Sequence, residues 1–149
     1  MKRENYRRKP NQKYIVTTFK DRKLKQKIVT FNELQNIKQG ETDLFINEKT
    51  REVSFQPPEG KRIDYKDDIS GIGSYEWQLL LDILWAAGEW VELASENYIN
   101  ARVLRVRKAF GGSKQKPWFF QTRRNPTYAV RWNPDRSWRF IEKKAASCE

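Results

Sequence analysis

The 149-residue sequence contains no histidine and only one cysteine. Without histidine it lacks the commonest general base of enzymes and most zinc ligand sets. The lone Cys148 excludes an internal disulfide and a zinc cluster built on cysteines. No run approaches the roughly 20 apolar residues that cross a bilayer, and the basic N-terminus is not followed by the apolar core of a secretory signal. We therefore expect a cytoplasmic protein that is not an enzyme and uses no membrane, metal or cofactor.

The net charge of +11 is strongly segregated along the chain. Residues 1–30 carry 11 Lys/Arg against 2 Asp/Glu, residues 31–99 carry 6 against 14, and residues 100–149 carry 13 against 3. Evenly solvated surface charge does not segregate in this way, so the pattern favours a face that binds a polyanion. The alternative is that the acidic middle neutralises the basic ends within one fold.

The segment 97–110, NYINARVLRVRKAF, is expected to form a basic amphipathic helix. Ile99, Val103, Val106 and Phe110 recur at helical spacing, so they lie on one narrow face that must pack on a core. Cationic side chains cover the remaining surface, and a Gly-Gly pair then ends the helix. We interpret this segment as the recognition helix of a DNA-binding domain.

The elements around this helix are strands and one apolar helix. Residues 75–87 are expected to form a core helix, capped by Ser74 and ended by Gly88. Before it, alternating apolar residues predict a hairpin at 14–31 and an antiparallel β meander over 44–65. After the basic helix, 118–122 and 128–132 predict a hairpin, with 138–141 returning as its third strand.

The order of these elements resembles the winged helix-turn-helix effector domain of OmpR/PhoB-type response regulators. The resemblance covers residues 43–132 and rests on four pieces: LFINEKTREVSF, IDYKDDISGIGSYEWQLLLDILWAAGEWV, ARVLRVRKAFG and FFQTRRNPTYAVRW. The third piece is similar to the family's recognition helix through Val103, Val106, Arg107 and Lys108. The last piece is similar to its wing strand.

Two features depart from that family. Only residues 92–96 lie where the family has a full second helix, and an Arg-Arg-Asn-Pro run replaces the wing glycines. The fold class predicted from the resemblance is α+β: a winged helix with an N-terminal antiparallel β meander, a core helix, a recognition helix and a C-terminal β-hairpin wing. Residues 1–13 are expected to be a flexible basic arm, 14–142 a single domain, and 143–149 a tail.

The leading functional prediction is a transcriptional regulator that reads double-stranded DNA and lies on the nucleoid. Asn100, Arg105 and Lys108 are expected to contact bases, while Arg102 and Arg107 reach phosphates. Leu104 would contact a thymine methyl, the arm or another subunit. The loop and hairpin add further cations to the predicted DNA-binding set: Lys114, Lys116, Arg123, Arg124 and Arg131.

Three other functions stay open at this stage. The basic face of the domain would instead dock on an acidic protein partner within a nucleoprotein assembly, or a second copy would complete a homodimer. Aromatic residues between 118 and 140 would stack on single-stranded RNA or DNA if exposed, or would form the buried face of the hairpin. Carboxylate-x-lysine pairs, Glu59 with Lys61 and Asp64 with Lys66, are also seen at metal-dependent nuclease sites.

Overall fold

The computed structural model describes residues 12–50, 52–66, 73–93, 103, 105–110 and 118–144. Three short helices lie wholly within this part of the chain: α2 (Phe31–Leu34), the 3-10 helix η1 (Gln39–Glu41) and α3 (Ser74–Trp85). Residues 103 and 105–109 also have helical backbone. Its nine strands are β1 (Lys13–Lys20), β2 (Lys23–Thr30), β3 (Leu44–Asn47), β4 (Glu52–Phe55), β5 (Ile63–Lys66), β6 (Val91–Glu92), β7 (Phe120–Arg123), β8 (Ala129–Trp132) and β9 (Trp138–Lys143).

Strands β1 and β2 form the expected N-terminal hairpin. All eight residues of β1 pair with β2, and the two-residue turn places Asp21 and Arg22 at positive φ, 54° and 64°. Such a turn matches the right-handed twist of the strands. The side chains of β1 are mostly buried, whereas those of β2 are exposed from Lys23 to Ile28.

The larger sheet has the strand order β2-β1-β9-β3-β4-β5. The predicted meander is present in it as the antiparallel strands β3, β4 and β5. Strand β9 lies in the middle, antiparallel to β1 and parallel to β3. The final strand therefore joins the N-terminal hairpin to the meander.

The predicted winged-helix fold is wrong. The described residues are mostly β, with nine strands in two sheets and only short helices, and this is not a core helix and recognition helix followed by a wing. The C-terminal segment explains much of the difference. Residues 138–141 were expected to extend the hairpin, but as part of β9 they pair with β1 and β3 in the larger sheet.

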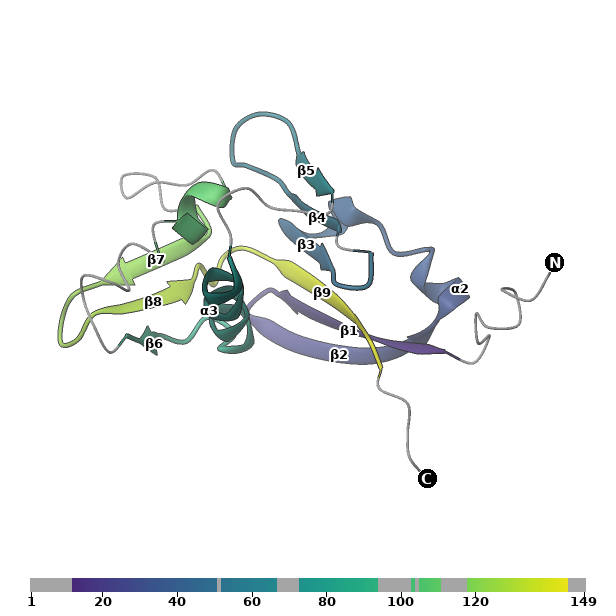
Figure 1. Ribbon diagram of the computed structural model, residues 1–149, viewed down its shortest axis with the longest axis horizontal. Coiled ribbons are helices and arrows are strands. Elements are labelled where there is room, and N and C mark those ends of the chain that lie inside the picture. Colours follow the sequence, from purple (N-terminus) through teal and green to yellow (C-terminus); the bar gives the residue numbers. More distant parts are fainter. Residues whose placement is uncertain are drawn as a thin grey trace, which may run out of the picture.

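Helix α3 lies between the two sheets (Figure 1). Its N-cap residue is Gly73, one position earlier than the expected Ser74. The Glu76 carboxylate accepts the Gly73 N–H at 2.9 Å. It ends where Ala87 and Gly88 take positive φ, and a Cβ on Gly88 would lie 3.3 Å from Pro134. The buried residues of α3 share one core cluster with both sheets: Phe19, Leu44, Phe55, Leu80, Ile83, Leu84, Phe120, Trp132, Trp138 and Phe140.

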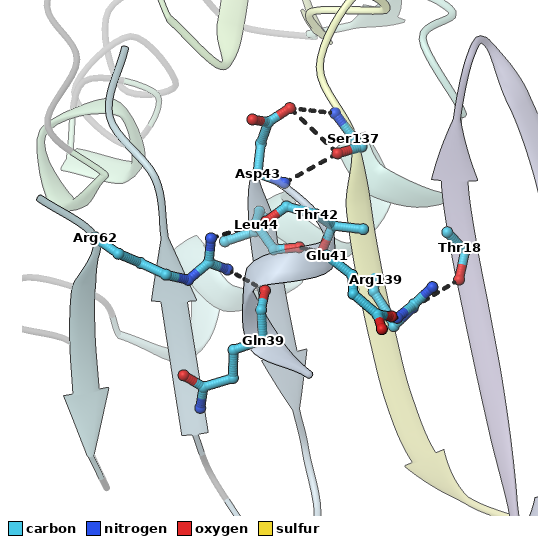
Figure 2. A network of polar contacts seen from close by, with 9 residues as sticks. All are labelled: Thr18, Gln39, Glu41, Thr42, Asp43, Leu44, Arg62, Ser137 and Arg139. Atoms are coloured by element: carbon cyan, nitrogen blue, oxygen red, sulfur yellow. Dashed lines mark hydrogen bonds and ion pairs between the residues drawn. The ribbon is translucent and has the colours of Figure 1, made fainter. Parts of the chain in front are cut away.

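The other face of the larger sheet carries a second, smaller apolar cluster of Tyr14, Val16, Val29, Phe45 and Ile141, against which Leu34 and Ile37 pack. A network of polar contacts also fastens this sheet (Figure 2). Arg62 donates to the Ser54 hydroxyl at 3.0 Å and to the carbonyls of Thr42 and Gln39 at 2.9 and 2.6 Å. Asp43 accepts the Ser137 N–H at 2.8 Å. These contacts fasten the segment before β3 to the residues at the ends of β4 and β9.

Candidate nucleic-acid interface

The smaller sheet, in the order β6-β8-β7, presents one polar face. The register places Gln121 opposite Arg131, and both Arg123 and Glu92 opposite Ala129. Residues directly opposite one another in antiparallel strands share a face. The opposite face carries Phe120, Val130 and Trp132, which are buried in the core. We call the polar side the arginine face: Glu92, Gln121, Arg123, Ala129 and Arg131.

Trp90, just before β6, orients two arginines of this face. The Arg123 guanidinium carbon lies 4.7 Å from the centre of the Trp90 ring, and that of Arg131 lies 4.5 Å away. Arg131 also donates through Nε to the Gln121 side-chain oxygen at 2.8 Å. A guanidinium close to an indole face is attracted by the ring quadrupole, and its rigid fork remains able to bind phosphate. The stacking therefore preorganises two cations on one small sheet.

These arginines have no carboxylate partner among the described residues. Arg22, Arg105 and Arg139 form ion pairs in this part of the chain, but Arg123 and Arg131 do not. Glu92 shares their face without coming within ion-pair distance of either. Arg124 follows β7 in the exposed turn and is also unpaired. The hairpin thus carries three cations that no described carboxylate neutralises.

Arg107 lies inside the molecule. Only 5% of the residue is exposed, its Nη2 donates to the Thr122 hydroxyl at 3.3 Å, and its Nε has no partner. Burial lowers the pKa of the guanidinium, and the nearby Tyr128 opposes that shift. The phosphate contact predicted for Arg107 stays a prediction, but it would need solvent access that this position does not give.

The described part of the basic segment, residue 103 and residues 105–109, has helical backbone. Three residues of its apolar stripe, Val103, Val106 and Phe110, are buried as expected, and the fourth, Ile99, lies outside the described residues. Lys108 is exposed, as a DNA contact requires. Arg105 is partly exposed but is held at 3.0 Å by the buried carboxylate of Glu76. The other predicted site residues, Asn100, Arg102, Leu104, Lys114 and Lys116, lie outside the described residues.

The aromatic residues of the C-terminal hairpin mostly belong to the core. Phe120, Val130 and Trp132 are buried, which confirms that reading of their alternation, and Tyr128 is half-buried. Phe119 and Trp132 stack on each other at 5.5 Å, inside the molecule. These buried rings therefore offer no stacking platform to an unpaired base.

Metal chemistry finds no support in the described geometry. Throughout the ranges that the structure describes, no three Asp, Glu, His or Cys side chains gather closely enough to hold a metal ion. Asp67 and Asp68, which directly follow the second carboxylate-x-lysine pair in the sequence, fall outside those ranges. Within the same ranges, no helix is both long and apolar enough to cross a membrane.

Sequence reasoning assigned no role to Trp90 or Gln121. The sequence did contain a signal for Trp90. It directly precedes Val91, which packs against the core. In an extended chain, that position points to the opposite face. Which cations would meet there depends on the pairing of β6 with β8, which joins segments almost 40 residues apart.

No family model matches the chain, and no curated protein or solved structure gives a significant match. The resemblance to response-regulator effector domains therefore stays a prediction from sequence.

Proposed function

We propose that this chain is a DNA-binding protein that regulates transcription from the nucleoid, and that the arginine face contacts the phosphate backbone. The observation that carries the proposal is the pair of guanidiniums, Arg123 and Arg131, held on Trp90 without a carboxylate partner in the described chain. Cations that are partly buried are commonly paired or hydrogen-bonded within the protein. Cations left preorganised and unpaired favour an external anion, and the net charge of +11 supports a polyanion.

Arginine contacts to phosphate position a protein on DNA and contribute affinity through counterion release, without reading the sequence. Sequence preference would come from Lys108 and its neighbours on the basic segment, as predicted from the sequence. Arg105 contributes to sequence preference only if its guanidinium reaches a base while it remains paired with Glu76.

Equilibrium binding to a mixed-sequence duplex, measured over a series of salt concentrations, tests the proposal. The logarithm of the binding constant should fall linearly with the logarithm of salt, by about 0.9 for each phosphate neutralised. Arg131→Gln should weaken binding to every duplex alike and reduce this slope by about one. Absence of binding at low salt would exclude DNA as the ligand, and a strong preference for the matching single strand would replace duplex by single-strand binding.

Arg136→Gln is the matched control. It removes the same charge from the turn between β8 and β9, which is not part of the arginine face, and the Arg136 side chain makes no described polar contact. Equal losses in both variants would mean that net charge alone governs binding, and the assignment to the arginine face would then be wrong.

A further inference from the structure

The outer strand of the larger sheet has an unusual combination of features. β2 is the last strand in the sheet, so one of its edges has no partner strand among the described residues. It is eight residues long and pairs with β1 without interruption. Side chains from Lys23 to Ile28 are exposed. A long, regular and uncovered edge is a ready template for another strand.

The two faces of this edge differ in chemistry. Lys23, Lys25 and Lys27 alternate along one face, and Lys20 of β1 lies opposite Lys23 on the same side. None of these lysines forms an ion pair in the described chain. The other face carries Leu24 and Ile28, which are 45% and 56% exposed. We call this strand the lysine edge.

Edge lysines commonly protect a sheet from pairing with copies of itself. Two lysine edges joined in antiparallel fashion would bring both rows of lysines onto one face, where like charges in adjacent strands repel. A second copy of this chain is therefore disfavoured as the occupant. A strand with carboxylates at alternate positions turns that repulsion into attraction.

We propose that the lysine edge binds an extended acidic peptide segment of a partner protein by β-strand addition. Main-chain hydrogen bonds to the free edge of β2 would hold the segment in register. Its acidic side chains would lie beside Lys23, Lys25 and Lys27, and the apolar residues between them would cover Leu24 and Ile28. This surface is separate from the arginine face and does not depend on DNA binding.

Fluorescence anisotropy with the full chain tests the proposal. The probe is a labelled seven-residue peptide, Glu-Val-Glu-Val-Glu-Val-Glu, compared with a peptide of the same composition that has its glutamates and valines in separate blocks. Alternation is needed to present one acidic and one apolar face, so the first peptide should bind at least about tenfold more tightly. Equal affinities would overturn the proposal, because charge alone would then explain binding.

Backbone methylation separates strand addition from any other acidic contact. Methylating the nitrogens of alternate residues removes one outward row of donors. Methylation of the alternate nitrogens that face β2 should abolish binding, and methylation of the other alternate nitrogens should be tolerated. If both sets are tolerated, no strand is added and the proposal is wrong.

Variants locate the surface. Lys25→Glu should reduce peptide affinity by about tenfold or more, and Ile28→Lys should also weaken it. Lys61→Glu is the matched control, since Lys61 is exposed just before β5, at the opposite edge of the sheet. Equal effects of Lys25→Glu and Lys61→Glu on peptide binding would overturn the proposal. The proposal would also be overturned if the unsubstituted chain bound no peptide and Lys25→Glu lost duplex binding. That result would assign the lysines to DNA binding.

Discussion

Arg105 on the basic helical segment donates through Nη1 to Oε2 of Glu76 on α3, at 3.0 Å. The two side chains differ sharply in environment, because that of Glu76 is 6% exposed and that of Arg105 is 56% exposed. The same carboxylate accepts the Gly73 N–H through Oε1. A buried anion thus links the first turn of α3 to the segment that was expected to read DNA.

Removing Arg105 should destabilise the fold more than neutralising Glu76. Arg105→Ala leaves a buried carboxylate with one donor fewer, at a cost of about 1–3 kcal/mol in the free energy of unfolding. Glu76→Gln leaves an arginine that water can solvate, so the loss should stay below about 1 kcal/mol. Urea unfolding of both single variants and of the double variant measures this difference, and the double variant should recover most of the loss. A larger cost for Glu76→Gln than for Arg105→Ala would contradict this account.

The double variant also separates folding from DNA contact. Because its stability is largely restored, any loss of duplex affinity that remains belongs to the missing guanidinium itself. If affinity recovers along with stability, Arg105 is a structural residue and makes no base contact.

Replacing the buried Arg107 by methionine should leave the fold as stable or stabilise it by up to about 1 kcal/mol, because a desolvated cation without a carboxylate gives way to an apolar chain of similar length. Thr122 is partly exposed, so we expect its hydroxyl to regain a hydrogen bond from water. The midpoint of urea unfolding gives the measurement. A loss above about 1 kcal/mol would show that the guanidinium stabilises the core.

The salt dependence of duplex binding by Arg107→Met tests the predicted phosphate contact. A guanidinium that stays internal releases no counterion, so the slope should match that of the unsubstituted chain. A slope reduced by about one would mean that Arg107 emerges to meet DNA.

Arg22 occupies a left-handed backbone conformation that disfavours side chains. Its φ is 64° in the turn between β1 and β2, and its ion pair with Asp135 joins two largely exposed groups. Arg22→Gly should therefore stabilise the protein by about 0.5–1 kcal/mol, since relief of the conformational cost outweighs the entropy of glycine and a weak surface pair. Arg22→Ala, which keeps the strain and loses the pair, should be no more stable than the unsubstituted chain. Thermal unfolding distinguishes them, and a less stable glycine variant would refute the argument.

Local signals in the sequence were sufficient for several elements. Alternating apolar residues located the N-terminal hairpin and the meander, and the spacing of Leu80 and Leu84 located α3. These signals act over a few residues, and the structure contains each of the elements. The stripe of Val103, Val106 and Phe110 is likewise buried as predicted.

Pairings between distant segments decided the rest. The residues of β9 alternate as any strand would, and nothing in them specifies insertion between β1 and β3, about a hundred residues away. The arginine face also depends on a pairing between distant segments. Arg123 and Arg131 were expected as contacts because they are basic, but their stacking on Trp90 arises only once β6 pairs with β8. The winged-helix prediction failed because it took neighbours in sequence as neighbours in the sheet.

Glu142 on β9 should make stability fall as the pH rises. Burial, and secondarily the nearby Glu48, raises the pKa of this carboxyl in the folded chain. A group whose pKa is raised by folding contributes fully to stability below its unfolded pKa, near 4.5, and loses that contribution as the pH climbs through its folded pKa. Glu142→Gln should therefore raise the thermal midpoint at pH 7 and leave it nearly unchanged at low pH. The gain should stay below about 1 kcal/mol, because the group is half-exposed and screened by water.

Glu41 supplies the opposite case for comparison. Its hydrogen bond from Arg139 lowers the pKa of the carboxyl, so its contribution is present above the unfolded pKa and is lost as the pH falls. Glu41→Gln should accordingly lower the thermal midpoint at pH 7 and have little effect in acid. Midpoints of both variants measured across the acidic range should diverge in opposite directions as the pH rises. If both variants shifted the midpoint in the same direction, a general charge effect would be responsible, and the local environments of the two carboxylates would not explain it.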